Sequence, residues 1–149
     1  MSKKKNKVSF RLVDVTTEQF ALFKENHDKE DIEFDIKFNA YVKVSSEERI
    51  IGLFTRYSFD QILGPVIFLE CACHFKIEEE AWKKKIQDSI ITIKKELLTH
   101  FLVLTVGTSR GVLHVKKPKW LRDIMLPTID VTSVFLEDLS FDLSAEEEE

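Results

Sequence analysis

The strictest pattern in this sequence is an alternation of apolar and polar side chains from residue 31 to residue 44. Apolar residues occupy every second position from Ile32 to Val44, and mostly polar residues lie between them. Successive side chains of an extended strand point to opposite faces, so a period of two predicts a long strand with one buried face. Such a strand needs partner strands and a second layer to cover it.

Two further strands are expected directly after the first. The polar residues 45–48 predict a turn, and alternate apolar residues resume from Ile51 to Phe59. Leu63-Gly64-Pro65 predicts a second turn, and another strand is expected from Ile67 to Ile77. Short connections join neighbouring antiparallel strands, so these three form a meander. Residues 8–12 predict an additional, shorter strand.

The apolar period changes from two to 3.6 at about Glu79. Apolar residues then recur every three or four positions from Trp82 to Leu104, which predicts one long amphipathic helix. Residues 107–111, with a glycine at each end, are expected to cap it. The predicted fold class is therefore α+β, with a four-stranded antiparallel sheet packed by one long helix.

Length and composition fit one domain. The 149 residues are 44% hydrophobic and 32% charged, with a formal net charge of −4. We expect a single domain at residues 8–143, between a disordered basic tail at 1–7 and a disordered acidic tail at 144–149. This charge balance argues against a nucleic-acid partner.

The sequence shows no targeting or membrane signal. The basic N-terminal residues are not followed by an apolar run, and the most apolar stretch, residues 97–106, is about half the ~20 residues of a membrane span. Cys71 and Cys73 are expected to be buried free thiols on one strand, which suits a reducing cytoplasm. We expect a cytoplasmic protein that does not insert into a membrane.

More apolar residues are present than one sheet and one helix face require. Alternation places Ile50, Phe54, Val66 and Phe68 on the outer face of the sheet. A second helical stripe contains Ile91, Leu98 and Leu102. Apolar patches of this kind mark interaction sites, so the two interpretations are an oligomer interface and a groove for a polypeptide. We assign the helical stripe to the interface and Phe54 and Phe68 to the groove.

The sequence contains no recognisable catalytic or metal-binding motif. The segment 107–111 lacks the lysine and spacing of a phosphate-binding loop. The four histidines are scattered without a nucleophile or carboxylate at motif spacing, and no acid/base pair of carboxylates stands out. We therefore expect no enzyme activity, no cofactor and no metal site.

The order of these elements resembles the bacterial export chaperone SecB. A first strand, a long connection, a three-stranded meander and a long helix are followed by Gly107-Thr108-Ser109-Arg110-Gly111, which is similar to the Arg-Gly turn of that family. Residues 126–131 stand where the family has a Pro-containing stretch before a second helix. The resemblance covers residues 8–139 and implies a Greek-key sheet, a short C-terminal helix and a dimer-of-dimers assembly.

The resemblance also implies ATP-independent binding of non-native polypeptides in apolar grooves. The family has groove-lining aromatic residues in the crossover between its first two strands, where this chain has Phe20 and Phe23. The alternative is that these two residues fix the crossover to the sheet. The chain departs from the family at its end, because no Cys or His follows His114 to form the metal-binding tail that engages the preprotein translocase. Export is therefore less well supported than holdase activity.

Three other functions stay open at this point. The chain could be a dedicated chaperone of one partner, such as an antitoxin. It could be a structural oligomer or adaptor whose apolar patches are used up in self-association. It could also be a small-molecule binder or an enzyme that uses a cavity between sheet and helix.

Overall fold

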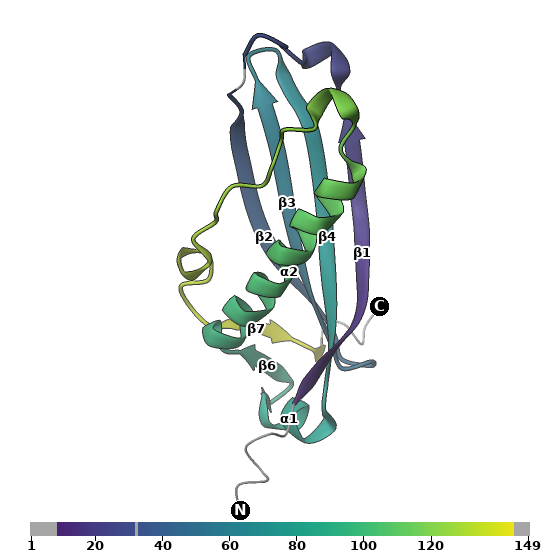
Figure 1. Ribbon diagram of the computed structural model, residues 1–149. Coiled ribbons are helices and arrows are strands. Elements are labelled where there is room, and N and C mark those ends of the chain that lie inside the picture. The colour runs from purple at the N-terminus through teal and green to yellow at the C-terminus, as the bar shows by residue number, and fades with distance from the viewer. Residues whose placement is uncertain (1–8, 32, 145–149) are drawn as a thin grey trace, which may run out of the picture.

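The computed structural model describes residues 9–31 and 33–144. The tails predicted at 1–7 and 144–149, the strand position Val8 and the inward position Ile32 lie wholly or almost wholly outside these residues. The described chain forms an α+β fold with a four-stranded antiparallel sheet, one long helix and a small three-stranded sheet (Figure 1).

The large sheet is the predicted meander with one strand added. Its strands are β1 (Phe10–Leu22), β2 (Asp35–Ser45), β3 (Ile50–Gln61) and β4 (Gly64–Ile77), in the spatial order β1-β4-β3-β2. The long connection after β1 leads to β2 at the opposite edge of the sheet, so β1 lies beside β4, the last strand of the meander. This is Greek-key order. β1 extends ten residues beyond the predicted end at residue 12, and it is an edge strand with irregular register after Leu12 and after Thr17.

Alternation along the strands is confirmed by burial. Every second residue of β3 from Ile51 to Phe59 is fully buried, and Cys71 and Cys73 of β4 are buried free thiols. These side chains face α2 (Lys95–Lys116), which crosses one face of the sheet. The core beneath the helix includes the stacked rings of Phe75 and Phe101, whose centroids are 3.9 Å apart.

The prediction of a single helix from residue 79 is wrong, because the chain forms a short helix, a two-stranded hairpin and then a separate long helix. A short helix α1 (Glu79–Lys84) is followed by the strands β5 (Ile86–Gln87) and β6 (Ile90–Ile93), and α2 begins only at Lys95. Asp88 and Ser89 both have positive φ, 54° and 65°, which gives the two-residue turn that a tight hairpin requires. Isoleucines at 86, 90, 91 and 93 favour strands. The spacing of three or four residues between several of them also fits one face of a helix, which led to the wrong prediction.

The predicted end of the helix is also corrected. Residues 107–111 lie inside α2, which continues to Lys116 and ends before Pro118. Nothing lies within 4 Å of the position where a Cβ of Gly107 or Gly111 would stand, so both glycines face open space. Arg110 is likewise mid-helix, and its Nη2 donates to the Pro127 carbonyl oxygen at 3.0 Å.

The C-terminal segment has a strand where a second helix was expected. It contains single 3-10 turns η3 (Lys119–Leu121) and η4 (Val131–Ser133), and then β7 (Leu139–Asp142), which pairs with β6 to complete the sheet β5-β6-β7. The segment runs back along the β2 side of α2 (Figure 1). Ile129, Val131 and Val134 pack there against the core. No helix within 9–31 and 33–144 is long and apolar enough to cross a membrane.

Candidate functional site: an aromatic pocket at one end of the sheet

A pocket of about 430 Å³ lies where the β1–β2 crossover meets the segment that follows α2. The crossover contains the 3-10 turn η2 (Lys24–Asn26), and both parts stand at the same end of the molecule in Figure 1. Three separate stretches of sequence form the walls. The lining residues are His27, Lys29, Asp31, Phe34, Ile36, Phe59 and residues 120–125.

Gln61 fixes the crossover to the end of β3. Its Nε2 donates to the carbonyl oxygens of Asp31 at 2.8 Å and Asp28 at 3.3 Å, and its Oε1 accepts from the Asp28 backbone N–H at 2.8 Å. The His27 Nδ1 lies 3.1 Å from the same Oε1. Because this oxygen can only accept, the His27 Nδ1–H is the donor of this hydrogen bond. The crossover wall of the pocket is therefore held by a nearly buried amide.

The opposite wall is held by the end of α2. Lys117 follows the helix, and its Nζ donates to the Ile124 carbonyl oxygen at 3.0 Å. Together with the bond from Arg110 to Pro127, this turns residues 118–127 back over the sheet. Leu121 and Ile124 are buried in the second core cluster, which also contains Phe59.

Aromatic rings make the inner surface of the pocket. The ring of His27 lies parallel to that of Phe34 with centroids 6.3 Å apart, and it lies 5.3 Å from the Trp120 ring. The Trp120 ring also has a cation–π contact with Lys24, whose Nζ lies 5.6 Å from the ring centroid. Met125 is 73% exposed at the rim. Such a surface gives apolar contact area with few fixed hydrogen-bond requirements.

Both signs of charge stand around this surface. Lys29, Arg122 and Asp123 form no ion pair or side-chain hydrogen bond within the described residues, whereas Asp31 accepts from the Glu33 backbone N–H at 2.9 Å. The lining contains no Ser, Thr, Tyr or Cys side chain, so it offers no hydroxyl or thiol nucleophile. No group of three or more His, Cys, Asp or Glu side chains in 9–31 and 33–144 is arranged to hold a metal ion.

The two crossover phenylalanines chosen from the sequence do not line this pocket. Phe20 lies within β1 and packs against the second core cluster, with the Lys116 Nζ 5.6 Å from its ring. Phe23 directly precedes η2, and its backbone N–H donates to the Val66 carbonyl oxygen at 2.8 Å. The packing of Phe20 agrees with the alternative in which these residues fix the crossover to the sheet.

Phe54 and Phe68 do lie on the outer face of the sheet, but Phe54 is covered. It is only 4% exposed, because the Tyr41 ring stacks on it at 4.8 Å and His74 contacts it edge-on at 5.6 Å. Val66, near the other end of β4, is fully buried in the second core cluster and is not part of an exposed outer patch. Phe68 is partly exposed, so it alone of this pair keeps surface for a partner.

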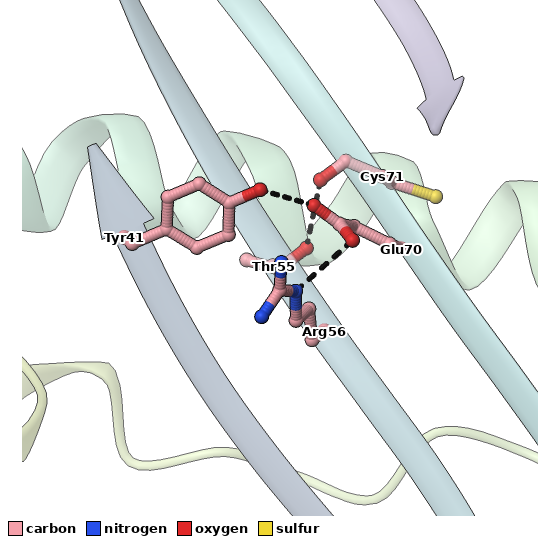
Figure 2. Close-up of polar contacts among 5 residues, drawn as sticks. All are labelled: Tyr41, Thr55, Arg56, Glu70 and Cys71. Carbon is pink, nitrogen blue, oxygen red and sulfur yellow. Dashed lines mark hydrogen bonds and ion pairs between the residues drawn. The ribbon is translucent and has the colours of Figure 1, made fainter. Parts of the chain in front are cut away.

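A polar network holds this covering in place (Figure 2). The nearly buried carboxylate of Glu70 accepts from the hydroxyl of Tyr41 and pairs with the Arg56 Nε at 3.0 Å. The Arg56 guanidinium also stands 4.8 Å from the Tyr41 ring. Burial, followed by the bond to Glu70, raises the pKa of Tyr41. The outer face is thus a closed structural layer around Phe54.

The residues assigned to an oligomer interface belong to the core. Ile91, Leu98 and Leu102 are fully buried within the single chain, which leaves them no surface for a second copy. Ile91 points inward from β6, and the other two face the sheet from α2. The helical stripe was wider than expected because the small sheet and the C-terminal segment also pack on it.

Sequence reasoning missed the pocket because its residues come from distant segments. His27 and Phe34 lie in the β1–β2 connection, whereas Trp120 lies far away in sequence after α2, and none of them belongs to a motif. The available signal was that aromatic residues occur in both connections that reach the same end of the sheet. No family model, curated protein or solved structure matches this chain.

Proposed function

We propose that this chain is an ATP-independent holdase that binds extended or non-native polypeptides, in the manner of the SecB family, without chemical turnover. The observation that carries the proposal is the aromatic pocket, which has an apolar floor and unpaired charges of both signs at its rim. A pocket of this kind accepts one large apolar side chain and places few demands on the neighbouring residues.

Binding at this pocket alone is weak by the usual measure of apolar burial. Enclosing one large apolar side chain contributes about 1.5–3 kcal/mol, which is roughly a tenfold to hundredfold gain in affinity. A bound chain therefore needs contacts beyond the pocket. The edge strand β1 supplies them, because Leu12, Val15 and Leu22 are 48%, 41% and 38% exposed beside an unpaired strand edge.

Several functional contexts fit this activity. The buried thiols Cys71 and Cys73 suit a cytoplasmic protein. Clients bound for the preprotein translocase and a single dedicated partner of the antitoxin type both present extended apolar segments. The pocket does not distinguish between them.

The test is suppression of aggregation of a chemically unfolded client diluted into buffer without ATP. We expect stoichiometric wild-type protein to reduce light scattering. Met125→Glu and Trp120→Ser should weaken this effect at least about threefold, because they place a charge or lose a ring at the pocket. Leu136→Glu is the matched control, since Leu136 is 69% exposed but lies outside the pocket.

The two outcomes separate cleanly. Equal suppression by wild type and by both pocket variants would exclude the pocket as the binding site. If light scattering is the same with wild type as with an inert protein, general holdase activity is excluded. Circular dichroism of each variant shows whether its fold is retained.

Small-molecule binding is the second candidate, because a volume of about 430 Å³ is typical of ligand pockets. It predicts a saturable rise in melting temperature with ligand concentration. Two results together would favour this candidate over the holdase. A ligand would raise the melting temperature of wild type but not of Trp120→Ser, and wild type would leave client aggregation unchanged.

We also propose that, without a client, a second copy pairs along the same edge of β1, so that self-association and client binding compete for this edge. Leu12 and Val15 of β1 are 48% and 41% exposed, and they follow Phe10, whose ring lies 5.6 Å from that of His100 in α2. Long, apolar edge strands associate unless they are covered. Val15→Lys should therefore lower the molar mass measured by light scattering, whereas an unchanged mass would exclude this edge.

A further inference from the structure

The small sheet β5-β6-β7 lies at the opposite end of the molecule from the β1–β2 crossover (Figure 1). A wide basin lined by lysines lies there. The basin has a volume of about 860 Å³, and it lies on the outward face of the small sheet β5-β6-β7. Lys84 and Lys85 stand at its β5 side, and Lys94 stands just after β6. The floor includes Gln87, Ile90 and Thr92, and Ile90 is 43% exposed.

The lysines of this basin are not ion-paired within the described residues. None of Lys84, Lys85 and Lys94 forms an ion pair or a side-chain hydrogen bond within the described residues. Lys83, which lies next to them in sequence, is paired with Glu79 at 3.5 Å. Lys85 is also partly buried. A partly buried lysine without a partner is uncommon, because removing the ammonium from water is costly.

Two acidic residues also line the basin, so its three lysines leave a net charge of +1. The Asp138 carboxylate pairs with no lysine side chain, and its Oδ1 accepts from the Lys95 backbone N–H at 2.9 Å. Asp88 stands on the β5–β6 turn in a left-handed conformation and forms no ion pair with the three lysines. Asp142, on the same face of β7, accepts from Ser144.

Lys85 and Lys94 repel each other across this surface. They are neighbours because the Thr92 backbone N–H donates to the Lys85 carbonyl oxygen at 2.9 Å, which brings the two ends of the hairpin together. Burial, and then the positive charge of Lys94, lower the pKa of Lys85. An anionic group between the two ammonium groups would relieve both effects.

We propose that this basin binds an acidic polypeptide segment, whose carboxylates pair with Lys84, Lys85 and Lys94 while an apolar side chain covers Ile90. A peptide fits better than a lone phosphate. The charges are single ammonium groups on flexible stems around a broad floor, whereas compact phosphate sites use an arginine fork or convergent backbone N–H groups. This inference is independent of the aromatic pocket.

The test uses a short fluorescein-labelled peptide of repeating Glu-Leu-Glu-Gly units and fluorescence anisotropy. Wild type should bind it with an affinity that falls as salt is added. The triple variant Lys84→Gln, Lys85→Gln, Lys94→Gln should bind about tenfold more weakly, as expected from three partly exposed ion pairs. The control is Lys43→Gln, Lys116→Gln, Lys119→Gln, which removes the same charge elsewhere and should bind within about twofold of wild type.

The inference is overturned if wild type does not bind the peptide, or if both triple variants lose affinity equally. It is also overturned if inorganic phosphate binds in a manner that requires the three lysines and the peptide does not. A basin variant that loses peptide binding but still suppresses aggregation separates this site from the holdase. Pocket variants that stop suppressing aggregation but still bind the peptide would show that the two sites are independent. Wild type that binds the peptide but does not suppress aggregation would overturn the proposed function alone.

Discussion

The two tyrosines of this chain should respond in opposite ways to the loss of a hydroxyl. Tyr57 is fully buried under α2, and its hydroxyl makes no hydrogen bond of acceptable geometry within the described residues, although the Thr55 and Ser109 hydroxyls, which bond to each other at 3.2 Å, lie near it. Tyr41 is on the outer face, and its hydroxyl donates to Glu70. The substitutions Tyr57→Phe and Tyr41→Phe remove the same atom from these two environments.

The magnitudes follow from what each hydroxyl contacts. An unsatisfied buried polar group costs about 1–3 kcal/mol. Removing the Tyr57 oxygen leaves a void of roughly 10–15 Å³, worth about 0.3 kcal/mol at ~24 cal/mol per Å³. We expect Tyr57→Phe to raise the free energy of unfolding by about 1 kcal/mol. Tyr41→Phe should lower it by about 1 kcal/mol, because Glu70 loses a hydrogen bond to a charged group at a partly exposed position.

The assay is urea unfolding at neutral pH, followed by circular dichroism and by tryptophan fluorescence. Coincident transitions and unchanged slopes would show that only stability has changed. A fall of more than about 0.5 kcal/mol for Tyr57→Phe would refute the reasoning, because it would mean that the hydroxyl makes a favourable bond. Equal effects for both variants would likewise contradict the assignment of Tyr41 as the bonded residue.

Three further predictions concern pH and backbone conformation. Burial raises the pKa of both Tyr41 and Tyr57 above the ordinary value of 10.0, so the folded chain holds these protons more tightly; unfolding free energy should fall as pH rises above about 10, and less steeply in either Phe variant. A flat profile in wild type up to pH ~11 would contradict this. Gly107→Ala and Gly111→Ala should each raise the free energy of unfolding by about 0.5–1 kcal/mol, seen as a higher melting temperature, because both residues lie inside α2 with space for a Cβ. Destabilisation would instead indicate that these residues cap a helix. Asp88→Gly should stabilise the β5–β6 turn by a few tenths of a kcal/mol, as measured by urea unfolding, because φ is 54° there, and a loss would indicate a side-chain contact of Asp88.

The sequence by itself determined the large sheet and its buried face. Strict alternation in β2, β3 and β4 is a local property, because side chains of a strand necessarily alternate between two faces. Burial of Leu53, Leu69 and Cys73 therefore followed directly. Short connections fixed the order of these three strands.

The tertiary structure decided the region from residue 79 to residue 94. Its isoleucines satisfy a helical stripe and a strand pattern equally well, and the choice depends on whether Asp88 and Ser89 adopt positive φ. Pairing of β6 with β7, some fifty residues later, stabilises the hairpin. A local pattern cannot contain that information.

The candidate sites depended on the tertiary structure for the same reason. His27 and Trp120 become neighbours only because β1 and α2 end at one end of the sheet. Lys85 and Lys94 come together only because the hairpin folds back. Alternation put Phe54 on the outer face correctly, but its covering by Tyr41 and His74 arises across strands. Local periodicity fixes which face a side chain occupies, whereas the packing of distant segments decides whether that face is open to a partner.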